Sequence, residues 1–576
     1  IFYVQSSYSQ TTYTVTSTTV GPNTTSGTFL WAVDQANTNP GADIIEFTTG
    51  LQVNASATNV SLQNSIMALI NESVTIDGKG SSLNGYQLWV TQGGIVNPLS
   101  NCPNSTPSLT QYSYMPGFVA IGTRGQDNSA IEVTIKNLTV KQFNQVAQIA
   151  DNASLILDNF TGLETWGTLQ CAGEPMINGV DGASLTIKNS LFENAKNWGT
   201  IPFAGSIYMG SNAGDLIIEN SRFRDLTFGS QPAVYHSGVA GSKLNIVSSR
   251  FYQSGGIETF GAVETNIVNS IWTNKATLIP SVSDRIINNS SGDMNIIASS
   301  IMWNTNQCDG LCGASMDNQT SLIEIRAEGD INFLQSAVGF NFDPSTGAPA
   351  LLTLGVATGG TATKGVFTAD EYTYIEPTTI QDAAALNTLV TTPPSTSLLT
   401  GVGFIRGVVP TTGIDTDVAL VTPAADGELI GPIPSVITLI NPIDGSTIAF
   451  DVVGNPREDA NSERDIGALQ LALAPFLSVS SSGDSEVALS WNEPLHHDGL
   501  DIVRYEVTYD VSGGSSPTTI PIDLPALTQT ISGLTNGTAY EFKVRAIYNA
   551  TGTEEIGPYS NIVIATPIAS IGDFTV

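Results

Sequence analysis

Basic residues are scarce in this chain. Its 576 residues include only 20 Lys and Arg against 52 Asp and Glu, and the formal net charge at pH 7 is −32. Nucleic acids and anionic membrane surfaces attract proteins through a basic face, so this balance argues against both as partners. The acidic residues are themselves dilute, because Ser, Thr, Asn and Gly dominate the composition, as in turn-rich secreted all-β proteins.

Long apolar runs are missing as well. No stretch approaches the roughly 20 apolar residues that a membrane-spanning helix needs, so we expect no membrane span. The first residue is Ile1 rather than Met, which fits a secreted chain whose signal peptide has been removed. We therefore expect an extracellular protein, either secreted or held at the cell surface.

Only four cysteines are present: Cys102, Cys171, Cys308 and Cys312. Four cysteines allow three pairings, and we favour Cys308–Cys312, which closes the loop CDGLC, with Cys102–Cys171 joining two long loops. A zinc site is the alternative, but the C-x₃-C motif has no second CxxC partner and the chain has only three histidines. Disulfides imply an oxidising compartment.

A pattern recurs between residues 131 and 338. Each copy has a large apolar residue, one intervening residue and a polar turn-former, and successive copies lie 21 to 36 residues apart. The polar positions are Asn137, Asn159, Asn189, Asn220, Ser248, Asn269, Ser299 and Gln335. Three residues later an apolar residue usually returns, at Val140, Phe192, Phe223, Phe251, Trp272, Met302 and Val338, with Gly162 as the exception.

Repeats of this length, with short apolar alternations split by a polar corner, are typical of a parallel β-helix. One coil cannot bury its inner face alone, so coils stack and share a core. We expect the polar corner residues to stack as a ladder, while loops of different length leave the other corners. An array of β-sandwiches with coincidental Asn turns is the alternative, and the recurrence of one local offset argues against it.

The N-terminal end predicts a cap for this solenoid. Residues 1–26 form an apolar and then strand-like segment that is suited to donating a strand to a neighbour. Five apolar residues follow at helical spacing: Phe29, Leu30, Ala32, Val33 and Ala36. Asn39-Pro40-Gly41 ends this helix, and residues 43–47 predict a strand. A helix at this point would cover the open end of the core.

Residues 28–33 (TFLWAV), 36–37 (AN), 40–43 (PGAD) and 45–47 (IEF) form one recognisable block. With residues 73–78 (SVTIDG) and the closing set Asp451, Gly454, Pro456-Arg457 and 465–468 (DIGA), this block resembles secreted pectate-lyase-like right-handed β-helix proteins, choice-of-anchor-type repeat proteins included. Trp31 stands where that family usually has Arg, at a structural position. The resemblance covers about residues 12–470 and implies an architecture rather than an activity.

The pattern changes from about Ala474. Apolar and polar residues alternate over 487–491, 503–509 and 540–546, which predicts strands. Tyr540 follows the turn LTNGTA, as in a tyrosine corner. Together with Trp491, Tyr505, Leu534 and the run Tyr559-Ser-Asn561, these residues resemble a fibronectin type III domain over 474–567. Such domains are usually spacers or interaction modules, and no Arg-Gly-Asp triplet is present.

The predicted class is therefore all-β. It comprises a right-handed parallel β-helix solenoid with an N-terminal capping helix, followed by a fibronectin type III β-sandwich. The expected limits are 1–26 for the N-terminal strand segment, 27–471 for the β-helix, 474–567 for the sandwich and 568–576 for a C-terminal tail.

Thirteen Asn-x-Ser/Thr sequons favour a secreted glycoprotein. The candidates for N-glycosylation are Asn23, Asn54, Asn59, Asn71, Asn104, Asn152, Asn288, Asn289, Asn318, Asn536 and Asn549. Asn137 and Asn159 rank below them because they fall on the predicted ladder.

β-Helices also host polysaccharide lyases and glycoside hydrolases. Hydrolases need paired carboxylates, and lyases need Ca²⁺-binding carboxylates with a basic residue. This chain has isolated acids on the predicted outer strands and lacks the Asp-Asp, Gly-His-Gly and Arg-Ile-Lys runs of pectinases. We expect no catalytic, cofactor-binding or metal site; Ca²⁺ is left as an option that no motif supports. We interpret His236, the only histidine of the solenoid, as structural.

Sugar binding is the other chemistry to weigh. Arg222 and Arg250 align on neighbouring coils, and Tyr235 is one of several aromatic residues in or beside loops, so these three are candidate glycan contacts. A solvated ion-pair strip and aromatic residues packed under their own loops are the plainer interpretations.

These features predict a non-enzymatic, extracellular structural protein. It would be a subunit of a cell-surface or filamentous assembly held by terminal strands and domain contacts, with copies of itself as the main partner. The alternative is a carbohydrate-binding adhesin, or a lyase-like or hydrolase-like β-helix protein, with cell-surface glycans as the partner.

Overall fold

The structure is a computed structural model of the chain. It describes residues 10–55, 66–85, 117–143, 145–164, 175–193, 196–197, 207–224, 226–228, 232–252, 254–273, 287–289, 292–302, 321–339, 352–357, 363–375, 383–391, 433–434, 437–454, 457, 463–469, 475, 477–494, 501–550, 553–560 and 562–568. The chain divides into two compact units. The first holds residues 1–400, 409–421 and 441–444, and the second holds residues 401–408, 422–440 and 445–576.

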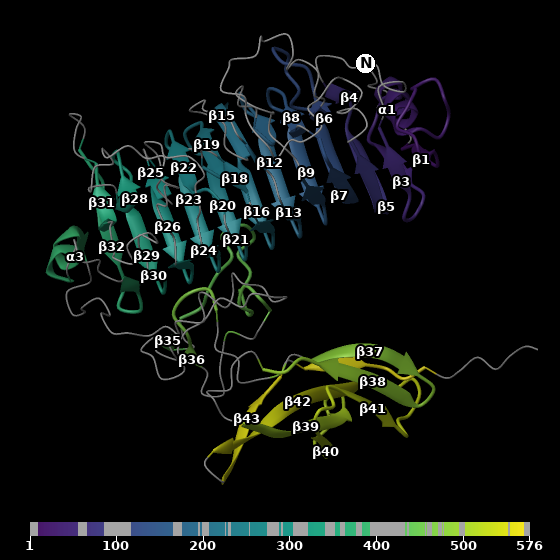
Figure 1. Cartoon of the computed structure of the whole chain (residues 1–576), viewed down its shortest axis with the longest axis vertical. Coiled ribbons are helices and arrows are strands. Elements are labelled where there is room, and N and C mark those ends of the chain that lie inside the picture. The colour runs from purple at the N-terminus through teal and green to yellow at the C-terminus, as the bar shows by residue number, and fades with distance from the viewer. Residues whose placement is uncertain are drawn as a thin grey trace, which may run out of the picture. The chain divides into compact units, whose positions relative to one another are not determined.

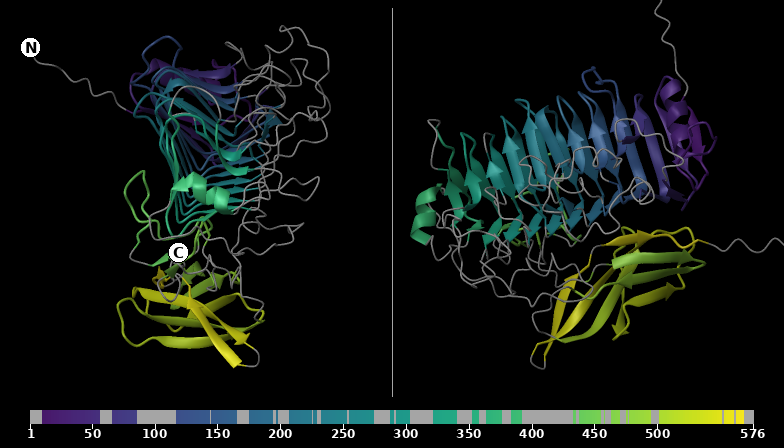
Figure 2. Two further views of the ribbon diagram at one scale, coloured as in Figure 1. Left: turned by 90° about the vertical axis from the view of Figure 1, so that its left-hand side faces the viewer. Right: turned by 45° about the horizontal axis from the view of Figure 1, so that its top comes forward.

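The first unit is a parallel β-helix whose coils present three faces. In each coil the chain crosses the first face, turns at a polar corner, crosses the second face and returns along the third. Figure 1 shows the strands of successive coils side by side, and Figure 2 shows the stack from two further sides. Neighbouring strands run in the same direction and pair in parallel. Each coil thereby forms hydrogen bonds with the coil before it and the coil after it.

The first face holds β1 (Thr12–Val15), β2 (Asp43–Phe47), β5 (Val74–Asn84), β7 (Glu132–Lys141), β9 (Ser154–Asp158), β12 (Ser184–Lys188), β16 (Leu216–Glu219), β20 (Lys243–Val247), β23 (Glu264–Val268), β26 (Met294–Ile297), β29 (Ile331–Leu334), β32 (Phe367–Ala369) and β34 (Val390–Thr391). The second face holds the later parts of β5 and β7 with β3 (Gln52–Asn54), β10 (Thr161–Leu163), β13 (Leu191–Glu193), β17 (Arg222–Arg224), β21 (Arg250–Tyr252), β24 (Ile271–Thr273), β27 (Ser300–Met302), β30 (Ala337–Gly339) and β33 (Tyr374–Ile375).

The third face is a ten-stranded sheet. Its strands are β4 (Ile66–Ile70), β6 (Gly117–Ile121), β8 (Gln145–Ile149), β11 (Ile177–Gly179), β15 (Ile207–Ala213), β19 (Val234–Gly238), β22 (Ile257–Phe260), β25 (Ile287–Asn289), β28 (Ser321–Ile325) and β31 (Leu352–Val356). A short pair, β14 (Lys196–Asn197) and β18 (Thr227–Phe228), joins two loops.

Helices lie at the two ends of the coil stack (Figure 1). Helix α1 (Phe29–Thr38) begins at Thr28, whose hydroxyl accepts a hydrogen bond from the Trp31 amide at 3.3 Å, and ends at Asn39. Phe29, Ala32, Val33 and Ala36 are buried, so the predicted capping helix is confirmed. At the opposite end, the short helix α3 (Ala383–Leu389) buries Leu386.

Apolar columns run along the core because strands keep the same register from coil to coil. On the first face the inward column is Ile45, Ile76, Ile135, Leu157, Ile187, Ile218, Ile246, Ile267, Ile296 and Phe333. On the second face the rings of Phe192, Phe223, Phe251 and Trp272 stack in order, with centroids 5.3, 4.6 and 3.6 Å apart. Gly162 interrupts this ring column because a Cβ there would lie 2.7 Å from Phe192.

The second unit contains an antiparallel sandwich. One sheet has β37 (Leu477–Gly483), β38 (Glu486–Trp491) and β41 (Thr528–Ser532). The other has β39 (Asp501–Val511), β40 (Thr518–Asp523), β42 (Tyr540–Ala550), β43 (Thr553–Tyr559) and β44 (Val563–Ala565). A short antiparallel pair, β35 (Ile433–Pro434) and β36 (Glu463–Arg464), precedes them. The hydroxyl of Tyr540 accepts a hydrogen bond from the Thr535 amide at 3.1 Å, which is the predicted tyrosine corner.

Candidate interaction surfaces

The polar corner between the first and second faces adopts left-handed backbone geometry. Seven of the eight predicted positions lie there with φ between 45° and 53°: Asn137, Asn159, Asn189, Asn220, Ser248, Asn269 and Gln335. Asparagine tolerates this conformation better than most residues do, which explains why it recurs at the corner.

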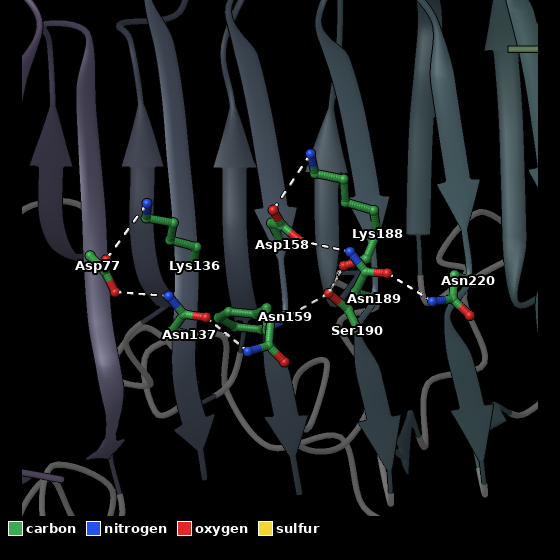
Figure 3. A network of polar contacts seen from close by, with 10 residues as sticks. Asp77, Lys136, Asn137, Asp158, Asn159, Lys188, Asn189, Ser190 and Asn220 are labelled. Atoms are coloured by element: carbon green, nitrogen blue, oxygen red, sulfur yellow. Dashed lines mark hydrogen bonds and ion pairs between the residues drawn. The ribbon is translucent and has the colours of Figure 1, made fainter. Parts of the chain in front are cut away.

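The corner side chains bond in short runs (Figure 3). Asn137 donates to Asp77 at 3.0 Å and Asn159 donates to Asn137 at 2.8 Å. The next run starts again, because Asn189 donates to Asp158 at 3.0 Å and Asn220 then donates to Asn189 at 2.8 Å. The predicted ladder is therefore present but broken, with carboxylates as the starting acceptors.

The predicted corner position was wrong by one residue in the coil that contains β26 and β27. Ile296, rather than Ile297, aligns with the inward column, so Ala298 occupies the corner with φ of 45° and Ser299 lies one position later. Ile301, rather than Met302, then faces Trp272 in the ring column. Two consecutive isoleucines precede the corner, and either choice satisfies the apolar pattern.

Ser299 instead belongs to a second ladder, directly after the corner. Its members are Ser190, Ser221, Ser249, Ser270, Ser299 and Ser336. Each hydroxyl accepts the amide of the equivalent residue one coil earlier at 3.1 to 3.2 Å, and each donates to the carbonyl two residues before it in its own coil. This serine ladder satisfies buried amides that the turn would otherwise leave without partners.

A third ladder runs along the outer side of the first face. Asn266 donates to Asn245 at 2.9 Å, Asn295 donates to Asn266 at 2.9 Å, and Asn332 donates to Asn295 at 3.0 Å. Sequence reasoning missed this first-face asparagine ladder, although the motif of Asn followed by two apolar residues recurs in KLNIV, ETNIV, DMNII and DINFL. Outward polar groups on this face thus bond mainly to their own neighbours.

The third face carries a stack of aromatic rings on its outer side. Tyr208 and Tyr235 stack with centroids 4.6 Å apart, and Phe260 follows Tyr235 at 5.3 Å. Burial raises the pKa of Tyr235 to about 12, with smaller contributions from Tyr208 and Glu258. Asn178 precedes Tyr208 in the same column, is 8% exposed, and its Oδ1 lacks a hydrogen-bond partner among the described residues.

The three candidate glycan contacts are not brought to one face. Arg222 and Arg250 are register neighbours on the second face, as the coil alignment predicted. Tyr235 lies on the third face, within the tyrosine stack. Arg224, two residues after Arg222, pairs with Glu193 at 3.8 Å and lies over the ring of Tyr252, which matches the plainer interpretation of an ion-pair strip.

His236 points into the core. It is fully buried, its Nε2 lies 2.8 Å from the Gly214 carbonyl oxygen, and its Nδ1 lacks a partner among the described atoms. Burial lowers the pKa of this imidazole below its ordinary value. The histidine is therefore held neutral inside the coil stack.

The asparagine residues of the sequons differ in how exposed they are to solvent. Asn23, Asn54, Asn71 and Asn152 are exposed, although the Asn152 amide lies 3.3 Å from Asp127. Asn536 is half-buried and donates to Asp484 at 2.7 Å. Asn289 does not suit a glycan acceptor, because it is 1% exposed and its amide donates to the Gly292 carbonyl at 2.7 Å.

Several candidates fall outside the described residues or have side chains that the structure does not describe. Cys102, Cys171, Cys308 and Cys312 lie outside them, so both disulfides stay predictions. Asn59, Asn104 and Asn318 also lie outside them, and the side chains of Asn288 and Asn549 are not described.

The closing set Asp451, Arg457 and Asp465 lies in the second unit. Arg457 is 1% exposed and donates to the Gly467 carbonyl at 2.8 Å. Burial lowers the pKa of its guanidinium to about 10, against the opposite effect of the Asp451 and Asp465 carboxylates. Within the described ranges, the structure shows no group of three or more His, Cys, Asp or Glu that would hold a metal ion.

A basic cluster lies on the sheet formed by β39, β42 and β43. Glu506 accepts two hydrogen bonds from Arg545, at 2.7 and 2.9 Å, and one from Arg504 at 3.2 Å. Tyr559 lies beneath both Lys543, at 4.0 Å from the ring centroid, and Arg545, at 4.7 Å. Burial raises the pKa of Glu506, but the two arginines outweigh it and the pKa lies below its ordinary value.

Sequence reasoning missed this cluster. Arg504 and Glu506 alternate on one strand, and Lys543 and Arg545 alternate on another, so each pair projects from one side of the sheet. This spacing of two was the available signal.

Comparison with known proteins identifies one part of the chain. Residues 474–562 match the family model of the fibronectin type III domain. Similar solved structures include a myokine, with 16% identity over 17% of this chain and 98% of its own, and the fibronectin type III domain of human collagen XX, with 23% identity over 17% and 94%. A computationally redesigned β-sandwich protein has 19% identity over 17% and 96%. The TM-score is 0.14 in each case.

Comparison with curated proteins gives no match. The predicted fibronectin type III domain is confirmed by the family match, and the parallel β-helix by the strand pairings. The resemblance of the coils to pectate-lyase-like proteins stays a prediction. Among the helices that the structure describes, none is both long and apolar enough to cross a membrane.

Proposed function

We propose that this chain is a non-enzymatic structural protein of the extracellular space or cell surface, whose copies assemble through terminal strands. Fibronectin type III domains are common in extracellular proteins, which supports the location. The low content of basic residues and the many sequons support it further.

The observation that carries the assembly proposal is the edge strand β1. It pairs with β2 in parallel register from Thr12 to Val15, and no described strand pairs with its other side. Thr12 and Thr14 are exposed on it. An open edge offers unpaired amides and carbonyls that a strand from another molecule can bond.

The adjoining sequence suits such pairing. Residues 1–9 lie outside the described ranges; their first four residues are the apolar run IFYV, and β1 starts at Thr12. A segment of this kind from one copy, added to β1 of the next, would extend the first face from copy to copy.

A structural role also accounts for the outer polar residues. The side chains of the polar corner, the serine ladder and the first-face asparagine ladder form hydrogen bonds with neighbouring coils. Such ladders stiffen the stack and fix its register.

Electron microscopy and sedimentation of the full chain test the proposal through β1. The Thr11 and Val15 carbonyls bond to β2, so by alternation the Thr14 amide points to the open side. Thr14→Pro removes that donor and should abolish filaments, whereas Thr14→Ala should form them normally. A wild-type chain that stays monomeric at high concentration contradicts the proposal, and so does a Thr14→Pro variant that still forms filaments.

Carbohydrate binding is the second candidate, and the tyrosine stack of the third face favours it. Stacked rings next to amide groups, here Tyr208, Tyr235 and Asn178, suit the apolar faces and hydroxyls of sugars. Glycan-array binding that is lost in Tyr208→Ala and retained in Tyr13→Ala, a half-buried tyrosine near α1, would support it. Absence of binding by the wild-type chain to any acidic or neutral glycan would remove this candidate.

A further inference from the structure

The most exposed apolar side chains of the chain lie together on one edge of the sandwich. Among the described residues, ten large apolar side chains are exposed, and the three most exposed are Ile568 at 64%, Ile564 at 61% and Ile562 at 59%. The next, Phe450, is 48% exposed. The three isoleucines fall within seven residues, on β44 and directly beside it. Single exposed apolar residues are common on protein surfaces, whereas a contiguous strip of them marks a site of interaction.

Alternation along this strand places the isoleucines on one side of the sheet. Every second residue from Ile562 to Ile568 is exposed, and the residues between them are half-buried or buried. Ala565, for example, belongs to the core of the sandwich, whereas Ile564 before it lies opposite Glu541 on the outer side. The isoleucines therefore form a strip along the outer side of the edge strand.

The backbone of this edge is open as well. β44 pairs with β42 on one side, and no described strand pairs with its other side. The Pro567 carbonyl accepts the amide of Gly537, just before β42, at 2.9 Å. The Ile568 amide points the other way and donates to the Gly483 carbonyl at 3.0 Å, which closes the edge at that end. By alternation, the amide and carbonyl of Ile564 also point away from β42, to the open side.

The other edge strands of the sandwich are protected against pairing. β40 carries Pro521 and Asp523, β43 carries two glutamates and Pro558, and β37 and β41 expose mainly serine and threonine. Proline, charge and polar side chains are the usual means by which proteins prevent pairing at a sheet edge. Residues 562–566 (IVIAT) contain no proline and no charge. This edge is therefore suited to pairing with another strand.

We propose that this isoleucine edge, residues 562–568, pairs with the same edge of a second copy across a two-fold axis. The open stretch is 562–566, so complete antiparallel pairing sets Ile564 opposite its own counterpart. Each Ile564 amide then donates to the Ile564 carbonyl of the other copy. The two sheets become one continuous sheet, and the isoleucine strips of the two copies lie side by side on its outer side.

Charge favours a second copy of this edge as the occupant. Each copy carries a net charge of −32, so most surfaces of two copies would bring carboxylates together. At the isoleucine edge, the nearest charged residues in register are Glu541 and Lys543 on β42, which are of opposite sign. The two Glu541 side chains would be three strand spacings apart, about 14 Å, beyond the Debye length of about 8 Å at physiological ionic strength. Asp484 lies beside Gly483 at the closed end, so the two-fold axis sets its two copies at opposite ends of the paired stretch.

This contact goes beyond the proposed assembly through β1. It joins two sandwiches, whereas β1 lies at the end of the coil stack. A two-fold contact is also closed, because it links two copies and then leaves no further edge of its kind. The isoleucine edge would therefore connect chains in pairs, whether or not the coils also form filaments.

Sedimentation equilibrium of the full-length chain tests the pairing with matched variants. We expect Ile564→Asp to raise the dissociation constant of the pair at least about tenfold, because the two-fold axis sets the two new carboxylates opposite each other. Thr530→Asp adds the same charge at an exposed position of the other sheet and should associate like the wild type. Ile564→Val keeps an apolar, β-branched side chain and should do the same. Thermal unfolding shows that the variants are folded, and equal dissociation constants for Ile564→Asp and Thr530→Asp overturn the proposal.

A cysteine at Ile564 tests the register. In a hydrogen-bonded antiparallel pair the two Cα atoms are about 5.5 Å apart, within the range of roughly 4.4–6.8 Å that a disulfide spans. Ile564→Cys should therefore form a disulfide between copies on mild oxidation, and mass spectrometry of the linked peptide distinguishes it from the four native cysteines. Ile562→Cys should not, because it faces Thr566 and its own counterpart lies about 14 Å away. Equal yields for the two variants, or no disulfide with Ile564→Cys, overturn the proposal.

Hydrogen exchange of the full-length chain identifies the occupant. Protection of the Ile564 amide should increase with the concentration of the chain and be lost in Ile564→Asp. Protection that does not depend on concentration would mean that a segment of the same chain covers the edge, which overturns the proposal. A synthetic peptide of residues 1–9 that protects this amide and separates the pair would identify the terminal segment as the occupant, and that overturns it too.

The β1 edge is separable from this contact. In the Thr14→Pro background, strand-mediated filaments should be lost, while the pairing of sandwiches and the disulfide of Ile564→Cys persist. Normal filaments without the disulfide overturn the present inference alone. The disulfide together with a wild-type chain that forms no filaments overturns the strand-mediated assembly alone.

Discussion

Replacing Asn266 by Ala breaks the first-face asparagine ladder at an inner member. The Asn266 side chain is 6% exposed, donates to Asn245 at 2.9 Å and accepts from Asn295 at 2.9 Å. Alanine removes both bonds and leaves the Asn245 carbonyl oxygen, in a residue 4% exposed, without its donor. An unsatisfied buried polar group costs about 1–3 kcal/mol, and we expect the stability of the local coils to fall by that amount.

Hydrogen exchange of the full-length chain, followed by mass spectrometry, measures this loss where it occurs. Local opening free energies lower by about 1–3 kcal/mol correspond to exchange that is roughly five- to 150-fold faster in β20, β23 and β26. Thr186→Ala is the control, because Thr186 occupies the same column two coils before Asn245, and its register neighbours there, Ile156 and Ile217, offer no side-chain hydrogen bond. It should change local stability by less than about 0.5 kcal/mol. Equal exchange in the two variants would refute the energetic role of the ladder.

Three other outcomes follow from the core. Phe251→Ala should lower the free energy of unfolding by about 3–5 kcal/mol, because it empties the ring column between rings 4.6 and 3.6 Å away, and denaturant titration should show Phe251→Leu to be milder. A loss under about 1 kcal/mol would mean that the column collapses around the gap. Gly162→Ala should lower the melting temperature, since its Cβ would lie 2.7 Å from the Phe192 ring, and an unchanged value in calorimetry would show that the ring moves aside freely. His236 stays neutral when folded because burial lowers its pKa, whereas the unfolded imidazole binds a proton below about pH 6.5. Stability should therefore be lost as pH falls below that value, by up to about 1.4 kcal/mol per pH unit, and His236→Gln should flatten this dependence in denaturant titrations at pH 7.5 and 5.5. Identical pH profiles for the two proteins would contradict it.

The sequence predicts most of what the backbone of a coil requires. Left-handed corner positions favour Asn, so the corner could be located at Asn137 or Asn220 without a structure. The capping helix could also be predicted, because its buried residues follow helical spacing. The helix ends at Asn39, as the sequence indicated. The apolar pattern failed at Ile296 and Ile297, because two adjacent apolar residues do not reveal which one points inward.

What depends on register between coils could not be predicted in the same way. Asn245 and Asn266 are 21 residues apart, while Asn295 and Asn332 are 37 apart, so their alignment depends on loop lengths that carry no pattern. The basic cluster likewise brings Arg504 and Arg545 together through the pairing of β39 with β42 in one sheet of the sandwich. Local propensity determines each strand, but which side chains meet is decided by tertiary structure.

The parallel pairing of coils also determines how the first unit responds to mechanical load. Neighbouring strands are bonded along the stacking direction, so a pull along that direction stretches the hydrogen bonds of all three faces at one boundary together. A pull on a single chain end at β1 instead opens one strand at a time, because β2 is the only described strand that pairs with it. The same bonds therefore resist force well when it is spread over a whole coil and poorly when it enters through one strand. A partner that grips a complete coil would transmit far more tension than one attached only to the first strand.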